Sequence, residues 1–452
     1  MMWSTRPTLG GCPMSRTEPS LSNLALAIAL LAIPCLGDSQ ARIVRLSQVQ
    51  GDVQVDRNTG QGFEKAFLNL PITQDVKIRT GDSGLAELEF EDGSTLRLTP
   101  STVIEVPQLS LRDSGAKVSA IHLQEGTAYV NFKGAKDDEF DLALVREKIA
   151  LTHSAHIRVQ VGDTDVTVAA LNGEVEVEGP SGKVEISKNH KAVFDLLNDD
   201  RYKLARDFAE APYDSWDKQQ DQYRDRYSAS ASSYSPYAYG TSDLNYYGNF
   251  SNVPGYGTMW QPYFTGSGWD PFMNGAWAFD SGFGYGWVSA YPWGWTPYHY
   301  GSWMYIPGNG WMWQPGGAWM GGNAFPVYAN APLGFVPPVA PALPGQRIVT
   351  VNRGPQTINV GGLSNQVQIP NNSAGLGVPR GSISNLSLLS QAAEERGSVA
   401  ARIHTALPGG IDWGHGGYAP FSRQAASGYR GGTTTSTTTH SSSSHTSSGG
   451  RR

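Results

Sequence analysis

The stretch DVKIRTGDSGLAELEFEDGSTLRLTPSTVIEV, residues 75–106, decides the fold of the first part of this 452-residue chain. Apolar and polar residues alternate along it, which is typical of half-buried strands, and Asp92-Gly93 supplies the residue pair that a tight hairpin turn requires. The alternation places an apolar set on one face of the hairpin and a charged set on the other. The apolar set is Leu88, Phe90, Leu96 and Leu98, and the charged set, expected to face solvent, is Glu87, Glu89 and Arg97.

The same alternation continues from residue 42 to about residue 200, with a second hairpin turn at Asn172-Gly173. This block is therefore predicted to be all-β, with about a dozen short strands. Its carboxylates alternate outward and are interpreted as a solvated face and not as an acid/base pair. His153 and His156 are three residues apart, which on a strand puts them on opposite faces, so no metal site is expected there.

Three turns of this block carry a family resemblance: Thr80-Gly81 with Gly84, Asp92-Gly93-Ser94, and a Leu-x-x-Gly ending at Gly126. Together with the strand order, they resemble the FecR-type periplasmic domain over about residues 43–200. The resemblance implies a β fold in the bacterial periplasm. In its best-known setting it also implies a signal relay, with a cytoplasmic anti-sigma segment and one membrane span. Only about 20 residues precede the apolar run near the N-terminus, too few for a folded cytoplasmic domain, so the resemblance is used to predict the fold and the compartment of this chain, and not an anti-sigma activity.

Residues 1–41 are predicted to be an export signal, because Arg6 and Arg16 precede the apolar run Leu24 to Ile33 and a breaker, Pro34. That run is short for a bilayer span, which needs roughly 20 apolar residues. An uncleaved anchor is the alternative. Both cysteines, Cys12 and Cys35, precede the mature chain, which is then expected to lack disulfides and to work in the periplasm or outside the cell.

The charge distribution divides the rest of the chain. Residues 42–200 carry 17 Lys/Arg and 26 Asp/Glu, whereas residues 236–345 carry no Lys, Arg or Glu and three Asp. Residues 201–235 are interpreted as a helical joint followed by a Ser-rich linker, since Trp216, Tyr223 and Tyr227 have helical spacing. Residues 323–452 are rich in Pro, Gly, Ser and Thr and are predicted to be largely disordered, with a few strands and one helix near residues 388–402.

Residues 236–322 concentrate the tryptophans of the chain, most of them about eight residues apart. That spacing predicts a meander of short antiparallel strands with one Trp on each. The rings could form a small core without aliphatic residues, or they could form a contact surface. The candidate contact residues are Trp287, Trp293, Trp295, Tyr298, Tyr300, Trp303, Trp311 and Trp313.

As a surface, these aromatic residues would suit a neutral glycan or an envelope protein, because rings two apart on a strand share one face. Nucleic acid is not expected, since the block has no cation to neutralise phosphate. The strings YYGNFSNVPGYGTMWQP and YPWGWTPYHYGSWMYIPGNGWMWQP resemble an uncharacterised Trp-rich domain that often follows FecR-type domains. The resemblance covers about residues 240–320 and brings no function with it.

No catalytic motif, cofactor loop or metal-ligand spacing stands out in the sequence. The chain is therefore predicted to be a mainly β, non-enzymatic envelope protein that acts by binding, without a cofactor. A membrane-anchored FecR-like signal relay is the alternative prediction. An envelope hydrolase would instead require a carboxylate pair brought against the aromatic residues.

Overall fold

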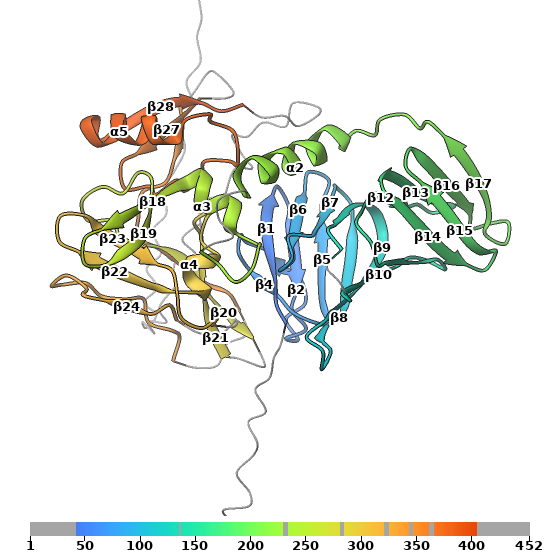
Figure 1. Cartoon of the computed structure of the whole chain (residues 1–452), viewed down its shortest axis with the longest axis horizontal. Helices are drawn as coiled ribbons and strands as arrows, with labels where there is room; N and C mark the ends of the chain where they lie inside the picture. The colour runs from blue at the N-terminus through green and yellow to red at the C-terminus, as the bar shows by residue number, and fades with distance from the viewer. Residues whose placement is uncertain are drawn as a thin grey trace, which may run out of the picture.

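The computed structural model describes residues 42–134, 137–228, 234–280, 284–320, 325–342, 347–360 and 366–404 (Figure 1). The predicted export signal and the low-complexity end after residue 404 lie outside the described residues. Within them the chain is mainly β, as the sequence predicts. None of the described helices is long and apolar enough to cross a membrane.

The N-terminal β domain, residues 42–206, consists of two layers of mostly antiparallel strands that share one long strand, β9. The first layer runs in the order β4 (Pro71–Ile72), β1 (Val44–Gln50), β6 (Leu85–Glu89), β7 (Thr95–Leu98), β9 (Lys117–Phe132), β12 (Ala155–Val161), β13 (Asp165–Asn172), β16 (His190–Asp195) and β17 (Arg201–Arg206). The second runs β3 (Glu64–Lys65), β2 (Val53–Asp56), β5 (Val76–Thr80), β8 (Val103–Leu111), β9, β10 (Glu139–Ala143), β11 (Lys148–Leu151), β14 (Glu174–Gly179) and β15 (Gly182–Ser187).

Strand β9 passes from one layer to the other at Gly126. Its first half pairs with β8 and β10, and its second half pairs with β7 and β12. Gly126 has φ 90°, and a Cβ there would lie 2.4 Å from the Thr102 hydroxyl oxygen, so glycine is the residue that fits the bend.

The space between the layers is filled by the apolar side of each strand. Leu88, Leu96 and Leu98 are fully buried there, and Phe90 is nearly so, which confirms the face predicted from residues 75–106. This burial supplies the main stabilisation of a domain that contains no cysteine, at roughly 25 cal/mol for each Å² of apolar surface removed from water.

The chain leaves the first layer through a strand and a helix. Residues 201–206, which the sequence assigned to a helical joint, form the edge strand β17, because the turn at residues 196–200 returns the chain beside β16. The predicted helix follows as α2 (Asp214–Ser228). In Figure 1, α2 runs along the top of β6 and β7 toward the rest of the molecule.

The aromatic domain, residues 241–404, contains three small sheets and three short helices within the described ranges. The helices are α3 (Thr241–Tyr247), α4 (Thr296–His299) and α5 (Leu386–Arg396). The first sheet consists of β18 (Gly248–Val253), β19 (Gly257–Pro262), β23 (Gly310–Gln314), β22 (Ser302–Ile306) and β24 (Tyr328–Ala329). The second consists of β21 (Gly284–Ser289), β20 (Asn274–Asp280) and β25 (Val349–Asn352), and the third of β26 (Ile358–Asn359), β27 (Gln366–Pro370) and β28 (Ser398–Arg402).

The predicted meander is present as hairpins but not as one continuous sheet. Three pairs of consecutive strands form hairpins, namely β18/β19, β20/β21 and β22/β23. The middle hairpin pairs with β25 instead of with its sequence neighbours. The chain leaves the sheet between β21 and β22, where it forms a turn and α4.

Glycines and tryptophans are paired across these hairpins. The Trp287 ring lies over Gly275, where a Cβ would be 2.4 Å from its Cζ2 atom, and Trp260 covers Gly248 in the same way at 2.5 Å. The composition of the block therefore follows from packing, because each large ring needs a position without a side chain on the neighbouring strand.

The segment after residue 323 is folded over much of its length. Ile369, Leu376 and Val378 are buried against the aromatic core, and β27, α5 and β28 form there. The strand and the helix expected in residues 366–404 are present, but this part of the tail is packed against the aromatic core and is not disordered. The helix ends at Arg396, and residues 398–402, which were expected to continue it, form β28. Apolar residues in this Pro- and Gly-rich segment lack strand or helix periodicity, so the sequence alone did not indicate their burial.

Candidate functional site: a buried charge network between the two domains

The face of the first layer that points away from the core carries charged residues that the structure buries. Glu87, Glu89 and Arg97 alternate away from Leu88 and Leu96 as predicted, but their exposed fractions are 0%, 2% and 0%. The expectation that they face solvent is wrong. A helix and the second domain cover this face, and covering elements from elsewhere in the chain cannot be seen in a local alternation pattern.

Helix α2 covers this face with charged residues spaced three, four and three apart, which places them on one side of the helix. These residues are Asp214, Asp217, Asp221 and Arg224. The two aspartates in the middle both contact Arg97 of β7, whose Nη2 lies 2.6 Å from Asp221. At the start of the helix Asp214 pairs with Arg158 of β12, and near its end Arg224 pairs with both Glu87 and Glu89.

The network extends from the β domain into the aromatic domain. Asp243 of α3 lies 2.7 Å from Arg45 of β1 and 2.8 Å from Arg380, which belongs to the segment before α5. Arg380 also reaches Glu87, at 2.9 Å, and Arg45 donates to the Pro292 carbonyl oxygen at 2.7 Å. Four parts of the chain therefore meet at one buried site.

We call this set the charge network. Its members are Arg45, Glu87, Glu89, Arg97, Asp217, Asp221, Arg224, Asp243 and Arg380. Four arginines thus face five carboxylates, so no carboxylate lacks an opposite charge. Such mutual pairing is the condition under which charges can be buried, because an isolated buried charge is very costly.

The ionisation of the network follows from this pairing. Burial favours the neutral form of Glu87, but Arg224, Arg97 and Arg380 outweigh it and hold the pKa of Glu87 well below its usual value. Burial likewise opposes charge on Asp243, and Arg380 and Arg45 keep its pKa low. Glu87 and Asp243 therefore remain charged at neutral pH and are held by their arginines.

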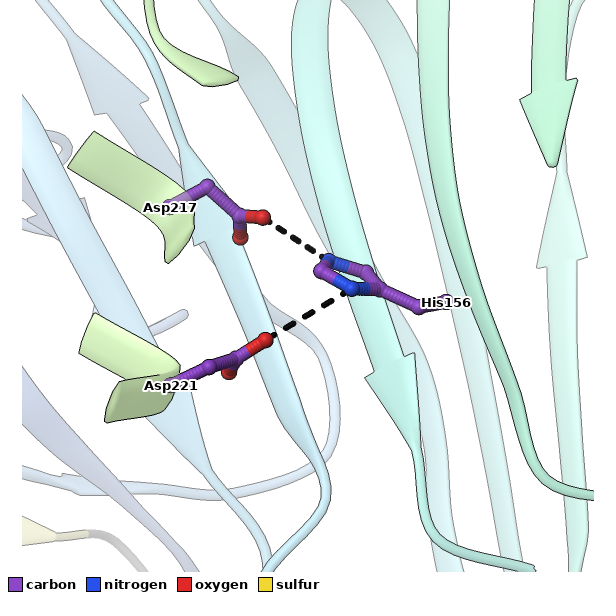
Figure 2. A group of neighbouring side chains, drawn as sticks. All are labelled: His156, Asp217 and Asp221. Atoms are coloured by element: carbon purple, nitrogen blue, oxygen red, sulfur yellow. Dashed lines mark ion pairs between the residues drawn. The ribbon is translucent and has the colours of Figure 1, made fainter. Parts of the chain in front are cut away.

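A group that could hold a metal ion lies beside the network. Figure 2 shows His156 of β12 between Asp217 and Asp221 of α2. His156 Nε2 is 2.8 Å from Asp217, and Nδ1 is 3.5 Å from Asp221. Each ring nitrogen thus faces a different carboxylate, whereas a metal ion would need both carboxylates on the side of one nitrogen.

The other carboxylate contacts also disfavour a metal at this position. Arg97 occupies one oxygen of each aspartate, and Asn131 donates to the second oxygen of Asp221 at 2.8 Å. The donor set fits a histidine ring in contact with two carboxylates better than a cation site. His153 is exposed and lies apart from this group, bonded to the hydroxyl of Thr152.

The candidate contact residues of the aromatic block lie almost entirely inside the molecule. All but one of them are buried, with exposed fractions of 3% or less. The buried ones are Trp287, Trp293, Trp295, Tyr298, Trp303, Trp311 and Trp313, and Tyr300 is half-buried. This arrangement agrees with the core alternative of the sequence interpretation, and an outside ligand cannot reach the buried rings in this conformation.

The predicted rows of rings on strands are present only in part. Trp311 and Trp313 share a face of β23, but Trp293 and Trp295 lie in the turn before α4, and Tyr298 lies on α4. Trp293 packs against Trp260 and stacks on Tyr291, whereas Trp295 packs against Tyr239 and His299 near β1. The spacing of two residues therefore does not place this pair on one face.

The hollows found among the described residues are small. The two best-formed hollows there have room for about 20 and 10 Å³, which is about one water molecule each. The first lies between the two domains, beside Ile43, Arg57 and Val288. The first has one carboxylate in its lining, Asp280. The second has three, Asp92, Asp138 and Glu139, of which Asp138 pairs with Lys117 and Glu139 with Arg112.

Together, the fold and the network define a class of protein: a two-layered β domain joined through a buried charged interface to an aromatic domain. Comparison with known families agrees with this division. Residues 76–176 match the FecR protein family, and residues 241–341 match a family of unknown function, DUF6600. The chain therefore contains a FecR domain followed by a DUF6600 domain, which confirms both resemblances seen in the sequence.

Two crystal structures of a "putative anti-sigma factor" from Parabacteroides distasonis ATCC 8503 are similar to part of this chain. The sequence identity is 18% and the TM-score 0.27, and the match covers 31% of this chain. It also covers 63% of that protein, so this chain spans less than two thirds of its length. No curated protein matches.

The sequence interpretation missed most of the charge network. Arg45, Asp243 and Arg380 attracted no attention, because no residue of opposite charge lies near any of them in the sequence. One signal was available: Asp243 is one of three acids in a block of more than 100 residues, and a rare charge there suggested a buried partner. The spacing of Asp217, Asp221 and Arg224 on the predicted helix was a second.

Proposed function

We propose that this FecR-domain protein is an exported, non-enzymatic scaffold of the bacterial cell envelope that acts by binding another envelope component. The observation that carries the proposal is the charge network. It joins the FecR domain, α2 and the aromatic domain through paired buried charges, so the two domains present their outer surfaces in one fixed arrangement. A scaffold needs such a fixed arrangement, whereas a relay needs a part that changes.

The remaining features support the same proposal. The apolar run at residues 24–33 has the composition of an export signal, and residues 42–404 contain no cysteine that would require a reducing compartment. The aromatic rings that could have formed a glycan surface are used as core instead. The contact surface of the scaffold is therefore expected outside the Trp core, on the exposed side of the aromatic domain.

The experiment that tests this proposal produces the full chain, tagged after residue 404, in a bacterium. Cells are separated into periplasm, membrane and cytoplasm, and the mass of the recovered protein shows whether residues 1–41 are removed. We expect a processed chain in the periplasm that sediments with cell-wall material or with a partner protein. A processed chain that binds neither contradicts the scaffold function.

The same fractionation tests the signal-relay alternative. A relay predicts an unprocessed chain held in the inner membrane by the run Leu24 to Ile33, with a cytoplasmic protein bound to it. The FecR domain is the reason for keeping this alternative, because the FecR resemblance implies a signal relay in its best-known setting. Recovery of the unprocessed chain in the membrane, with such a partner, would replace the scaffold function by the relay.

A further inference from the structure

The segment from Phe325 to Ala342 crosses the surface of the aromatic domain and exposes apolar side chains. Leu333 is fully exposed, Val339 is 82% exposed and Val336 is 65% exposed. Exposed apolar residues are common singly, but several on one short segment mark an interaction surface more often. The segment contains no charged residue.

The segment is held in place by its aromatic side chains, which point inward. Phe335 packs against Trp311 with ring centroids 5.0 Å apart, and Phe325 stacks on Phe272 at 4.7 Å. Tyr328 lies in β24, which pairs with β22. The segment is therefore packed against the Trp core through its aromatic side chains, while Leu333, Val336 and Val339 remain exposed.

Proline determines the backbone of this segment. Pro337, Pro338 and Pro341 have fixed φ, and Val336 and Ala340 each precede a proline, which restricts them to extended or polyproline II conformations. Residues 335–341 belong to no helix or strand. Polyproline II has three residues per turn, so in that conformation the exposed Val336 and Val339, which are three apart, lie on one edge.

We propose that this edge, with Leu333 in the turn before it, is the docking surface of the scaffold and that its partner is a protein with an uncharged groove lined by aromatic side chains. Such grooves recognise polyproline II segments because these segments are already ordered before binding. The proposal rests on the proposed binding function and names its surface. We call Leu333, Val336 and Val339 the apolar ridge.

Other partners fit the ridge less well. The three prolines at positions 337, 338 and 341 lack the N–H groups that pairing with another strand requires. Nucleic acid would need cations, which the segment lacks. A lipid surface would favour outward aromatic residues and nearby Lys or Arg, whereas Phe325 and Phe335 point into the core.

The test places a photo-activated cross-linking amino acid at position 339 of the full chain in producing cells, and a control at Val145, an exposed residue of the FecR domain. We expect position 339 to cross-link one protein and position 145 to cross-link none. The cross-linked protein is then purified and its binding to the full chain is measured. A synthetic peptide of residues 331–342 should compete, and Val336→Ser with Val339→Ser should weaken binding at least tenfold.

Folding of the double variant is checked by the near-ultraviolet circular dichroism of the Trp core, which should not change because both side chains are exposed. Cross-links that form from position 145 but not from position 339 would contradict the proposal that the apolar ridge is the docking surface, and they would remain consistent with the scaffold function. Cross-links to lipid at position 339 would contradict the proposal that the partner is a protein with an aromatic groove. If neither position cross-links any macromolecule and the chain binds no cell-wall material, the ridge and the scaffold function both fail.

Discussion

Arg97 is the residue on which the contact between α2 and the FecR domain depends most. Its guanidinium contacts three carboxylates, Glu87 on the neighbouring strand and Asp217 and Asp221 on the helix, and its side chain is fully buried. Burial disfavours its charge, but these partners raise its pKa well above the usual value. Arg97 therefore stays charged, and its removal takes from Asp217 and Asp221 the arginine that both contact.

Replacing Arg97 by Met is expected to lower the free energy of unfolding by about 3–5 kcal/mol, the usual cost of removing one partner of a buried ion pair. Urea unfolding of the full chain, followed by circular dichroism, measures this change. The control is Lys183→Met, which removes an exposed pair with Glu176 and should leave the unfolding midpoint unchanged. Equal effects of the two variants would show that the Arg97 contacts do not stabilise the fold.

The buried side chain of His299 is expected to make the stability of the protein depend on pH. It is buried between Trp295 and Trp319, at ring distances of 4.1 and 5.5 Å. Burial lowers its pKa from 6.5 to about 4, although the Trp295 carbonyl bonded to Nδ1 acts in the opposite direction. The folded chain therefore holds this ring neutral at pH values where the unfolded chain protonates it.

Stability is expected to fall as the pH falls from 6.5 to about 4, because the unfolded state binds the extra proton in this window. The total loss from this residue is about 3 kcal/mol, since each pKa unit corresponds to 1.36 kcal/mol. The variant His299→Gln, which can still donate to Trp295, should show a smaller loss across the same window. Identical pH profiles for both proteins would exclude His299 as the cause.

Helix α2 is rich in charged residues, yet one side of it is buried against the FecR domain. Seven of its 15 residues are charged, yet Trp216, Asp217, Tyr223 and Arg224 are buried. Its acidic first half faces Arg97 and Arg158, and Arg224 near its end faces two glutamates. The charges of the helix and of the sheet are therefore complementary along its length.

The hairpins of the aromatic domain lead to a prediction at the element scale. Gly275→Ala places a Cβ 2.4 Å from the Trp287 ring and 2.6 Å from the Val288 carbonyl oxygen, so the ring or the strand must move. We expect a loss of about 1–3 kcal/mol, typical of overpacking, with altered near-ultraviolet circular dichroism.

The matched control for this change is Gly162→Ala. The nearest atom to a Cβ at Gly162 is the Asp165 carbonyl oxygen, at 3.4 Å, which is an ordinary contact. Its near-ultraviolet spectrum should be that of the unmodified protein. An unchanged spectrum for Gly275→Ala as well would contradict the close pairing of glycine and tryptophan across this hairpin.

For the whole molecule, the charge network predicts that the two domains unfold together. The FecR domain has no tryptophan between residues 42 and 215, so Trp fluorescence reports α2 and the aromatic domain, while hydrogen exchange reports both domains. One common transition is expected for the full chain. Changing Arg45 and Arg380 to Gln removes the contacts to Asp243 and should separate the transitions of the two domains.

The control for this double change is Arg112→Gln, in an exposed pair with Glu139 of the FecR domain. It should leave the transitions coincident. Two separate transitions in the unmodified chain would show that the domains are not coupled, and the fixed arrangement on which the scaffold proposal depends would then be wrong.

Prediction from the sequence was most successful where a local pattern carries the signal. The hairpin from Leu85 to Leu98, the helix around Trp216 and the helix that includes Leu388 were all anticipated in kind, although residues 398–402 form a strand and not the end of that helix. The charge network was not, because Arg45, Asp243 and Arg380 are separated by more than 130 residues from one another. A pattern in a short stretch of sequence cannot reveal a contact between residues so far apart in the chain.

The sequence by itself determined the β class of the chain, its division into a FecR-type and an aromatic block, and which residues of each strand share a face. These properties follow from alternation, turn residues and composition, which act over a few neighbouring residues. Only the tertiary structure decided what lies against each face. Glu87 and Arg97, expected to face solvent, are buried in an interface in the structure. Most of the tryptophans form a core, whereas Leu333, Val336 and Val339 are exposed on the surface. The physical reason is that the burial of a surface depends on which distant segment of the chain packs against it. An alternating pattern shows which residues share a face of a strand, but it does not show which segment packs against that face.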